Sequence, residues 1–412
     1  MSASAYDLVI VGGGVVGAAL ACLAGGKGGG PPLSVALVEA EEPSPFVLSE
    51  PLDLRVIAVS RAAQYILSAC GAWPAIRAAR VSPYREMRVW DAGGSARGYG
   101  SIHFDSADLG EPDLGCIVEN RLVLSALYDV LGSLAGIVIV RPAAPAAIDF
   151  GPDRVVVTLD DGRELAGRLV VGTDGTASRT RRLADLGCRG WSYGQAAVVA
   201  HVGTRLPHEA TAWQRFLPGG PLALLPLADG RSSVVWSAPA GRARELMEIP
   251  VPDFCDAVAE ASDFVLGSVT DSGPRASFPL QASYAPAYVR PRCALAGDAA
   301  HVVHPLAGQG ANLGLLDAAA LAEQIGDAVE SGRDPGDAST LRRYERRRKG
   351  HNLAMLLALD GAHRLFGSAI GPVGVARRAG LAAVDRAPPL KRRLARRAMG
   401  LDGDLPRLAR AS

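Results

Sequence analysis

Glycines and carboxylates occur together at three places where the sequence predicts the end of a buried strand. The first is Gly12-x-Gly14-x-x-Gly17, which directly follows the apolar run Leu8–Val11. Gly12 permits a tight turn, Gly14 lets a pyrophosphate approach the backbone, and Gly17 lets a helix pack closely on the strand. The N-terminus of that helix favours an anion, because its free N–H groups and its dipole point outward. The pattern therefore predicts a dinucleotide-binding β-α-β unit.

An acidic residue stands where such a unit needs one. Glu39 follows the second predicted strand, Ser34–Val38, where its carboxylate is placed to accept a hydrogen bond from a ribose hydroxyl. It lies 27 residues after Gly12, whereas about 20 residues are usual. We attribute the excess to a flexible loop of glycines and prolines, Gly25–Pro32. A glycine-rich turn without a ligand is the alternative.

Two further motifs repeat this arrangement later in the chain. Gly172-Thr173-Asp174-Gly175 follows the apolar run Leu169–Val171, although Asp-Gly alone can be a simple turn. Gly297-Asp298 leads through Gly308-Gln309-Gly310 into a predicted helix, Ala311–Val329. The Asp298 carboxylate is placed to hold the hydroxyls of a sugar-like chain. The N–H groups at residues 308–310 are placed to face developing negative charge.

The remaining elements predict two kinds of sheet. The start of the chain alternates strand and helix, as parallel sheets require, and a helix at Leu122–Leu131 and a strand at Gly136–Val140 continue the pattern. A hairpin is expected within residues 154–171. Evenly spaced strand-like runs then predict an antiparallel sheet, namely Ala196–Gly203, Ala212–Leu217, Pro221–Leu227 and Ser232–Ser237. A buried strand, Cys293–Ala296, precedes the last motif, and the chain is helical from Leu341 onward.

The composition is that of a globular protein and excludes several classes. Of the 412 residues, 49% are hydrophobic and 21% are charged, which excludes a disordered tail, a collagen-like repeat and a disulfide miniprotein. No run of about 18 apolar residues occurs, so no transmembrane helix is expected, and the best candidate, Val130–Val140, is too short. No basic stretch precedes the first apolar run, so no signal peptide is expected. The six cysteines lie far apart without a C-x-x-C pair, which predicts buried free thiols.

The charge is distributed unevenly along the chain. Residues 342–412 hold 17 Lys and Arg against 5 Asp and Glu, a net charge of +12, whereas the residues before them carry −11. Within this part, the basic run Lys391–Arg397 leaves Leu390, Leu394 and Met399 as an apolar stripe. Such a helix is typical of binding to an anionic membrane surface or an acidic partner. A solvated helix face paired with the acidic body is the alternative. Nucleic acid is not expected, because aromatic residues do not interleave with the charges.

In this order, the three motifs resemble those of FAD-dependent aromatic hydroxylases of the p-hydroxybenzoate hydroxylase type. The chain is more similar still to the ubiquinone-biosynthesis hydroxylases, the 2-polyprenylphenol hydroxylases. The resemblance covers nearly the whole chain. It is carried by the stretches Asp53–Ser60, Ile117–Arg121, Tyr193–Gln195, Thr211–Pro218, Gly297–Gly314 and Ala398–Gly400.

The resemblance implies an α/β fold. A Rossmann-like FAD-binding domain of the GR2/p-hydroxybenzoate hydroxylase type would carry an inserted, mainly antiparallel β-sheet substrate domain and a helical C-terminal end. We expect the FAD-binding domain to comprise residues 1–75, 106–182 and 286–340. The substrate domain is expected at 76–105 and 183–285, and the basic helices at 341–412.

The resemblance also assigns residues to the cofactor. The adenosine half of FAD is assigned to Gly12, Gly14, Gly17 and Glu39. The region of the phosphates and the ribityl chain is assigned to Arg55, Arg121 and Asp298, and the family's shared FAD and NAD(P)H signature to Asp174 and Gly175. The isoalloxazine is expected to contact the stretch that leads into the helix, with the helix start near ring atoms N1 and O2. That stretch contributes Pro305, Gly308, Gly310, Ala311 and Asn312.

The implied reaction is a flavin monooxygenation. NAD(P)H reduces FAD, O₂ adds at C4a, and the hydroperoxide transfers one oxygen to a phenol ring, while the protein orients the substrate and excludes water. No second G-x-G-x-x-G follows another strand, so NAD(P)H is expected to visit the flavin without a domain of its own. This absence and the cysteine spacing weigh against a disulfide reductase. A flavin halogenase is disfavoured, because no lysine lies between Lys27 and Lys349.

Four residues are candidates for the substrate pocket. His304 is expected either to line the ring-binding face or to serve only as a packing residue of the protein. Tyr193, Trp213 and Arg215 of the predicted sheet are expected to bound the pocket or else to be core or rim residues. The spacing of His301 and His304 suits a metal site on a helix, but no third ligand is evident and no metal is expected. No catalytic base can be assigned from the sequence.

Three functional hypotheses follow. The first is a cytoplasmic FAD monooxygenase that hydroxylates the ring of a polyprenylphenol in ubiquinone biosynthesis. Its basic end would place it at the inner membrane surface or in a biosynthetic complex. The second is a hydroxylase of a soluble aromatic, such as a phenolic acid or a pigment precursor. The third is a non-catalytic FAD-binding scaffold subunit, which is expected to show damaged flavin motifs, and none is seen.

Overall fold

The computed structural model describes residues 4–367 and 371–410, and these residues form three β-sheets. The first sheet has the order β17-β18-β11-β1-β2-β8, and its central strands are parallel. An antiparallel extension, β10 and β9, is attached to β11. The strands are β1 Ser4–Val11, β2 Val35–Val38, β8 Ile137–Val140, β9 Pro145–Phe150, β10 Val155–Leu159, β11 Glu164–Gly172, β17 Val289–Arg290 and β18 Cys293–Leu295.

The apolar run in β1 is continuous because both faces of the parallel sheet are covered. Leu8 and Ile10 belong to the hydrophobic cluster on one face, whereas Val9 and Val11 belong to the cluster on the other. The first cluster joins the sheet to a layer of helices. These are α1 Val15–Cys22, α2 Arg61–Cys70, α3 Trp73–Ala79, α4 Asn120–Gly132 and α8 Gln309–Glu330. The sheet therefore holds the ends of β1, β2 and β11 in one rigid layer.

The predicted loop Gly25–Pro32 begins later than expected. Residues Leu23–Lys27 form a π-helical turn, η1, which continues α1. Its last turn closes with a hydrogen bond from the Gly28 N–H to the Leu23 carbonyl at 2.9 Å. Gly26 supports this turn because its φ of +118° suits a residue without a side chain.

A small sheet and a large sheet complete the fold. The small sheet pairs β3 Val56–Ser60 and β4 Val81–Tyr84 with the central strand β7 Gly115–Glu119. The large sheet has the order β19-β16-β12-β15-β14-β13-β5-β6, and its neighbours are antiparallel except for β13 and β5. Its strands are β5 Glu86–Asp91, β6 Ser101–Asp105, β12 Arg189–Thr204, β13 Thr211–Leu217, β14 Gly220–Pro226, β15 Ser232–Pro239, β16 Val269–Tyr284 and β19 His301–Val302. Two helices, α6 Ala240–Glu248 and α7 Val251–Ala261, pack on this sheet.

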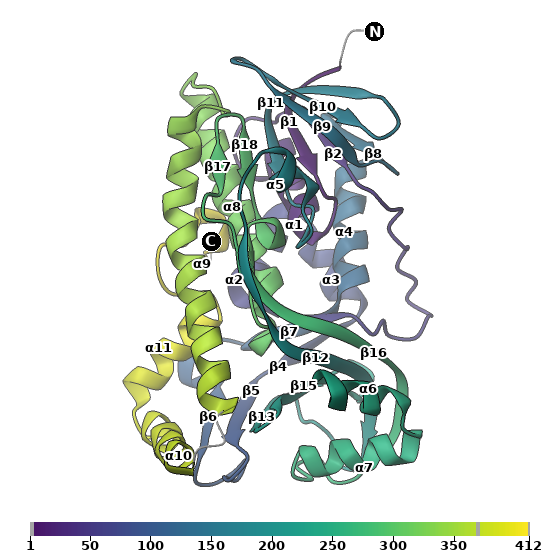
Figure 1. The fold of residues 1–412 in the computed structure, drawn as a ribbon, viewed down its shortest axis with the longest axis vertical. Coiled ribbons are helices and arrows are strands. Elements are labelled where there is room, and N and C mark those ends of the chain that lie inside the picture. Colours follow the sequence, from purple (N-terminus) through teal and green to yellow (C-terminus); the bar gives the residue numbers. More distant parts are fainter. Residues whose placement is uncertain (1–3, 368–370, 411–412) are drawn as a thin grey trace.

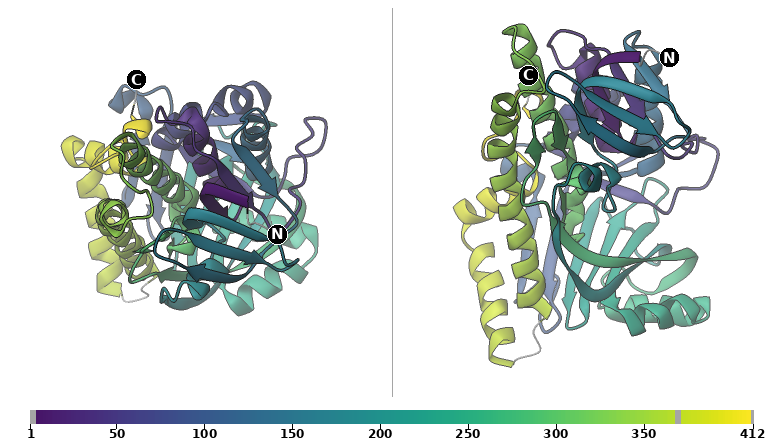
Figure 2. Two further views of the ribbon diagram at one scale, coloured as in Figure 1. Left: turned by 90° about the horizontal axis from the view of Figure 1, so that it is seen from above. Right: turned by 45° about the horizontal axis from the view of Figure 1, so that its top comes forward.

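The two main sheets lie at opposite ends of the molecule, and long elements join them (Figure 1). The strands β12 and β16 curve from the middle of the molecule into the large sheet, and the helix α9 Ala338–Gly367 runs beside both ends (Figure 2). Two further helices follow: α10 Gly371–Asp385 lies beside β6 at the lower end, and α11 Pro388–Ala398 packs against α10. The short elements are α5 Arg179–Leu183, η2 Ser106–Leu109, η3 Gly297–Ala299, η4 Leu306–Gly308 and η5 Arg407–Ala409.

The predicted fold class is confirmed. The strand pairing also shows which sheet each strand of the expected FAD-binding and substrate domains joins. Of the strands in residues 76–105, β4 pairs within the small sheet, whereas β5 and β6 join the large sheet. The strand β19 lies within residues 286–340 but extends the large sheet. The domain boundaries themselves stay a prediction.

Two expectations about exposure are wrong. Met399 does not continue the apolar stripe of α11, because its side chain is buried and its carbonyl accepts a hydrogen bond from the Ala62 N–H at 3.1 Å. The stripe is limited to Leu390 and Leu394, which are 46% and 43% exposed. The cysteines are free, but Cys188 is exposed because it lies in the loop between α5 and β12. Among the described residues, no helix combines the length and the apolar character needed to cross a membrane.

Candidate cofactor and substrate site

The glycine turn after β1 leaves no room for a side chain at two positions. Gly12 has a φ of +103°, and a Cβ there would lie 2.5 Å from the backbone of Thr173. A Cβ at Gly17 would lie 1.9 Å from the carbonyl oxygen of Gly12. A Cβ at Gly14, by contrast, would meet no atom of the described residues within 4 Å. Protein contacts therefore fix the turn at two glycines and leave the third open to a ligand.

Glu39 reaches the same turn from the end of β2. Its Oε2 accepts a hydrogen bond from the Gly13 N–H at 2.5 Å, and its Oε1 accepts one from the Glu41 N–H at 3.1 Å. The hydroxyl of Tyr128 in α4 donates to the Gly13 carbonyl at 3.1 Å. The carboxylate thus lies beside the turn, where a ribose would be bound. Tyr128 was missed by sequence reasoning, because nothing in its surroundings links it to the glycine motif.

The second motif lies beside the first, because β11 is the parallel neighbour of β1. The Thr173 hydroxyl donates to the Gly12 carbonyl at 2.7 Å and so couples the two turns. The Asp174 carboxylate accepts from the Ser178 hydroxyl at 2.5 Å and from the Thr180 N–H at 2.9 Å. Its oxygens therefore hold the loop that enters α5. Gly175 has a φ of +75° and no neighbour within 4 Å of a Cβ among the described residues.

Two arginines lie where the chain before β3 meets the start of α4. The two segments are joined by a hydrogen bond from the Asn120 N–H to the Arg55 carbonyl at 2.9 Å. Arg121 forms an ion pair with Glu50 at 2.9 Å. The Arg55 side chain is exposed and has no ion-pair or hydrogen-bond partner within the part of the chain that the structure describes. Arg55 is therefore a cation available to a phosphate.

Asp298 combines access to solvent with desolvated surroundings. Its side chain is exposed, yet most of what surrounds it is protein, and this desolvation raises the pKa of the carboxyl group. The charges of His301 and Arg55 oppose the rise in its pKa. Arg55 of the first segment and Asp298 of the last motif are therefore close enough to interact. An accessible carboxylate within the protein body suits a group that binds ligand hydroxyls.

The start of α8 offers backbone N–H groups rather than side chains. Its N-cap, Gly308, has a φ of +60° and makes no side-chain cap. The first N–H groups of the helix, at Gly310 and Ala311, thus lie at the positive end of the helix dipole. The Gly308 N–H was expected to join them but donates to the Pro305 carbonyl at 3.1 Å, because the chain forms the η4 turn there. Asn312 holds this helix start against β3, because its Oδ1 accepts from the Ser60 N–H at 3.0 Å and its Nδ2 donates to the Ala58 carbonyl at 2.9 Å. Pro305 is half-buried directly before η4.

A buried ion-pair network around Asp317 of α8 holds the last motif, at Gly297 and His301, in place. The Asp317 carboxylate of α8 accepts from His301 Nε2 at 2.5 Å and from the Gly297 N–H at 3.1 Å. Its other oxygen accepts from Arg348 Nε at 2.7 Å and from Asn352 Nδ2 at 2.9 Å. The charges of His301 and Arg348 hold the pKa of Asp317 far below its usual range, against the effect of burial. His301 is therefore bonded to a carboxylate of the protein.

The substrate candidates are not all brought together. Tyr193 lies against the His304 ring, with centroids 4.9 Å apart. Trp213 is buried in the core of the large sheet against Trp90. Trp213 lies on β13, three strands away from β12 in the large sheet. The strand pairing across the sheet aligns Trp213 with Ala200 of β12 and not with Tyr193.

The Arg215 side chain connects β13 to neighbouring segments of the large sheet and of α7. Its guanidinium donates to the carbonyls of Ala92 and Glu260, both at 3.1 Å, and forms an ion pair with Asp263 at 3.6 Å. These partners join β13 to the end of α7. Trp213 and Arg215 are thus placed away from the ring of Tyr193, and their expected contact with a substrate stays a prediction.

Two residues near Tyr193 were missed by sequence reasoning. The ring of His363 in α9 stacks on His304 with centroids 4.6 Å apart. Asp360, one turn earlier in the same helix, accepts a hydrogen bond from the Trp191 Nε1–H at 3.2 Å. The available signal was the spacing of Asp360 and His363, since residues three apart share a helix face. It was hidden within a segment whose main feature is its basic charge.

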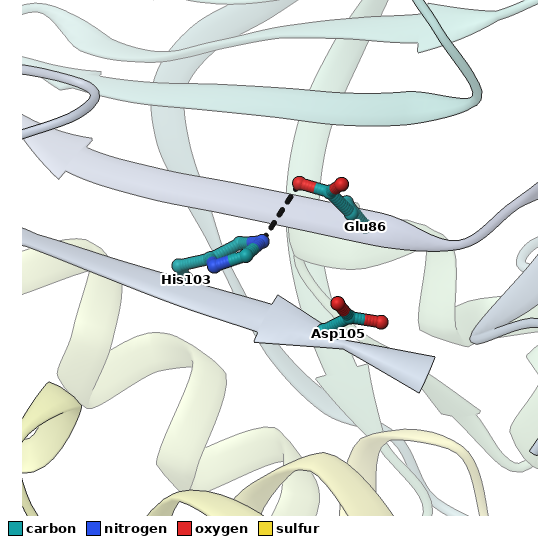
Figure 3. A group of neighbouring side chains, drawn as sticks. All are labelled: Glu86, His103 and Asp105. Carbon is teal, nitrogen blue, oxygen red and sulfur yellow. Dashed lines mark hydrogen bonds and ion pairs between the residues drawn. The ribbon is translucent and has the colours of Figure 1, made fainter. Parts of the chain in front are cut away.

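One group of side chains within the described residues has the composition of a metal site. Glu86, His103 and Asp105 lie on adjacent strands β5 and β6 (Figure 3). His103 Nε2 lies 2.7 Å from Glu86 Oε2, and Arg88 pairs with the same oxygen at 3.3 Å. Asp105 accepts a hydrogen bond from the Ala107 N–H at 2.9 Å. The cluster is thus explained by protein contacts, and the nearby guanidinium disfavours a cation.

Comparison with known proteins gives a consistent set of relatives. The model of a family described as an FAD binding domain matches residues 151–357. The chain is similar to a ubiquinone hydroxylase, UbiL, of Rhodospirillum rubrum, with 40% identity over 98% of this chain and 92% of the relative. It is 35% identical to the 3-demethoxyubiquinol 3-hydroxylase of Escherichia coli over 96% of this chain and 98% of that protein. Similarity extends to the mitochondrial ubiquinone biosynthesis monooxygenase COQ6 of Homo sapiens, at 37% identity over 94% and 91%.

Solved structures share the fold at lower sequence identity. The p-nitrophenol 4-monooxygenase PnpA of Pseudomonas putida has a TM-score of 0.78 at 19% identity, covering 98% of this chain and all of that one. PqsL of Pseudomonas aeruginosa, a probable FAD-dependent monooxygenase, has a TM-score of 0.75 at 23% identity, covering 92% of this chain and all of that one. The architecture of two sheets joined by long strands is therefore shared.

Proposed function

The chain belongs to the ubiquinone-biosynthesis hydroxylases, a family of FAD-dependent monooxygenases, and on that premise we propose that it hydroxylates the aromatic ring of a polyprenylphenol with NAD(P)H and O₂. The observation that carries this proposal is the length of the match. Relatives named for ubiquinone hydroxylation align with this chain along nearly all of it. The inserted sheet and the C-terminal helices are therefore shared as well as the FAD-binding part.

The residues of the site fit FAD. The turn at Gly12, which has no room for a Cβ, and the open Gly14 suit the pyrophosphate, and Glu39 beside them suits the ribose. Bound FAD, once reduced by NAD(P)H, supplies the activation of O₂ that a ring hydroxylation needs. Arg55 is placed to neutralise phosphate charge, and Asp298 to bind ribityl hydroxyls.

The start of α8 supplies the electrostatic part of the site. Its uncapped N–H groups and helix dipole stabilise negative charge on a bound ring. Asn312 fixes the helix start to β3, so this stabilisation needs no rearrangement of the protein. The buried network around Asp317 fixes the preceding motif in the same way.

A labelled-oxygen assay tests the reaction. Purified FAD-loaded protein, NAD(P)H and a short-chain 2-prenylphenol are incubated under O₂ enriched in a heavy isotope. We expect a product that carries one labelled oxygen on its ring, identified by mass spectrometry, and the fragment pattern then shows which carbon is attacked. Consumption of NAD(P)H with release of peroxide alone would contradict a polyprenylphenol substrate. Activity toward a soluble phenolic acid would then favour the second hypothesis.

We also propose that the C-terminal helices dock on an anionic membrane surface. Arg392, Arg393, Arg396 and Arg397 are exposed on α11 beside Leu390 and Leu394. An apolar groove of about 430 Å³ lies between the end of α9 and α10, lined by Leu365, Phe366, Val373, Ala376, Arg377, Gly380, Leu381 and Val384. Basic and apolar side chains at one end of the molecule suit the interface of a bilayer that contains acidic lipids.

Vesicle co-sedimentation tests the docking. The protein is expected to bind vesicles that contain phosphatidylglycerol and not vesicles of phosphatidylcholine alone. The variant R392E/R393E should lose this binding, because charge attraction to acidic lipid is removed. R163E, which changes a basic residue on the hairpin between β10 and β11, should bind as the unchanged protein does. Equal binding of both variants would contradict the proposed surface.

A further inference from the structure

Three rings from distant segments meet beside the last glycine motif, and we call them the ring cluster. They are Tyr193 of β12, His304 between β19 and η4, and His363 of α9. The two imidazole rings are stacked with centroids 4.6 Å apart, and the Tyr193 ring meets them edge-on at 4.9 Å and 4.7 Å. The cluster joins the large sheet, the cofactor motif and the long helix at one point.

His304 has hydrogen-bonding capacity that the protein does not use. Its side chain is 1% exposed, and neither Nδ1 nor Nε2 has a partner within the described part of the chain. The Nδ1 of His363 is likewise without a partner there. Buried polar atoms are almost always hydrogen-bonded, and each exception needs an explanation. Two unpartnered nitrogens on one buried ring indicate that a bound molecule completes the site.

The surroundings of His304 keep the ring neutral. Burial, and next the charge of His363, lowers the pKa of His304 to about 4, while the charge of Asp360 opposes this effect. A neutral imidazole has one nitrogen that donates and one that accepts. The accepting nitrogen is therefore unprotonated at physiological pH and open to a hydrogen bond from a bound hydroxyl group.

The other charged and titratable groups at the cluster come from β12 and α9. The Asp360 carboxylate accepts from Trp191 Nε1 at 3.2 Å and from Arg364 Nε at 2.8 Å, so its charge is largely paired. Burial, and next the charge of Asp360, raises the pKa of Tyr193 to about 12, which keeps its hydroxyl protonated. Burial also lowers the pKa of His363. His304 is therefore the ring of the cluster whose two nitrogens are both buried and unpartnered among the described residues, so its neutral form offers an acceptor to a bound hydroxyl group.

The position of His304 in the chain links it to the reacting part of the site. It directly precedes Pro305 and the η4 turn that leads into the uncapped start of α8. We propose that His304 is the base that accepts the hydroxyl proton of the aromatic substrate, and that His363 is a positioning residue that stacks on the His304 ring. This proposal rests on the ring hydroxylation proposed above and assigns the base that the sequence left unassigned.

The proton transfer is balanced and makes the ring more reactive. The phenol O–H bond breaks, an N–H bond forms on His304, and a neutral pair becomes a phenolate and an imidazolium. The phenolate pushes its electron pair into the ring and so favours attack of the ring on an electrophilic oxygen. When the hydroxylated ring loses its C–H proton to solvent and becomes aromatic again, the imidazolium returns its proton to the ring oxygen. His304 then ends neutral, as it began.

Ionisation of a bound phenol provides a readout that does not depend on turnover. Oxidised, FAD-loaded protein is titrated with 2-prenylphenol without NAD(P)H, and the phenolate is followed by its ultraviolet difference spectrum across a pH series. We expect the bound phenol to ionise at least about one pH unit below the free phenol, whose pKa is near that of tyrosine, about 10. In H304Q, which keeps a hydrogen-bonding side chain but no basic nitrogen, this shift should disappear, and kcat should fall by about 100-fold or more.

A buried histidine outside the cluster supplies the matched control. His201 of β12 has a pKa that burial, and next the charge of Arg231, lowers to about 4, and its Nε2 also lacks a partner among the described residues. H201Q should leave the ionisation of the bound phenol unchanged. If the phenol ionises at the same pH in H304Q as in the unchanged protein, the proposal is overturned. If H304Q abolishes the spectral shift while the unchanged protein makes no ring-hydroxylated product, the assignment of His304 as the base is supported and the proposed hydroxylation is contradicted.

A second variant keeps the proposal testable if H304Q does not retain FAD. H363F preserves a stacked ring but removes a charge that lowers the pKa of His304. The acidic limb of the pH profile of kcat/KM should therefore move upward, by about half a pH unit or more. An unchanged limb, with normal flavin content and thermal midpoint, would contradict the assignment of His304 and His363.

Discussion

Arg348 of α9 and Asp317 of α8 form an ion pair from which solvent is fully excluded, with Nε 2.7 Å from Oδ1. Both side chains of the pair form further hydrogen bonds. Asp317 also accepts from His301 and Gly297, and Arg348 donates to Asn352 Oδ1 at 2.8 Å. Such bonds offset the cost of burying two charges, although Nη1 of Arg348 has no partner among the described residues. The network thus ties the cofactor motif to two long helices.

Removing one partner of this network should be costly. In R348M the Asp317 carboxylate stays buried with fewer positive neighbours, so we expect the free energy of unfolding to fall by about 3 kcal/mol. Urea denaturation followed by circular dichroism measures the change. R163M, which removes an exposed partner of Asp161 on a hairpin, should leave the midpoint unchanged. A midpoint for R348M equal to that of R163M would show that the network contributes little.

The glycine turn offers two substitutions with different expected outcomes. G12A places a Cβ against the backbone of Thr173 at a positive φ, so it should disturb the turn itself and lower the thermal midpoint of the FAD-free protein. G14A meets no protein atom among the described residues, so it should fold normally but lose most FAD, because the Cβ occupies the phosphate approach. Flavin absorbance per protein and thermal melting of the FAD-free forms separate the two effects. Full flavin content in G14A would place the phosphates elsewhere.

Local patterns were sufficient to predict the elements that carry the cofactor. Leu8–Val11 is buried on both faces of a parallel sheet, and the residues that follow it turn as the glycine spacing requires. Glu39 lies at the turn because β1 and β2 are parallel neighbours. Each of these features depends on residues close in sequence or on the rule that parallel strands end at one edge.

Contacts between distant segments could not be predicted in the same way. His363 meets His304 only because α9 runs back along the molecule, and one sequence does not show where a long helix packs. Trp213 and Arg215 have types that suit a pocket, but the strand order of the large sheet places Trp213 in its core and directs Arg215 to the carbonyls of Ala92 and Glu260. Strand order depends on the whole chain, whereas strand existence depends on local sequence.

Arg55 should matter for ligand binding and little for folding. Its side chain is exposed and has no ion-pair partner among the described residues, while it is close enough to Asp298 to affect the pKa of that carboxyl group. We expect R55A to weaken FAD binding by about tenfold or more, because a charge-assisted contact to phosphate is lost. Isothermal titration of the FAD-free protein measures the affinity. R205A, at an exposed arginine in the loop after β12, serves as the control, and equal affinities of the two variants would show that Arg55 does not contact the phosphates.

The stability of the protein should fall on the acidic side of neutrality. Burial is the main cause that lowers the pKa of His201 to about 4, with Arg231 next, and it lowers the pKa of His351 to about 4, with Arg348 next. In the unfolded chain these groups titrate near pH 6.5. The unfolded state therefore binds protons first as the pH falls from about 6.5 to about 4, and the folded state loses stability over that window.

Urea denaturation at about pH 7.5 and about pH 5 measures this loss, and the substitution of one histidine assigns it. H201Q cannot take up a proton in either state, so the difference in unfolding free energy between the two pH values should be smaller than in the unchanged protein. H208Q, at a half-buried histidine that accepts from the Ala210 N–H at 3.2 Å, should keep the full difference. If H201Q and H208Q lose stability equally on acidification, burial of His201 does not contribute to the acid sensitivity. His351, whose pKa burial also lowers to about 4, would then account for the loss over this window.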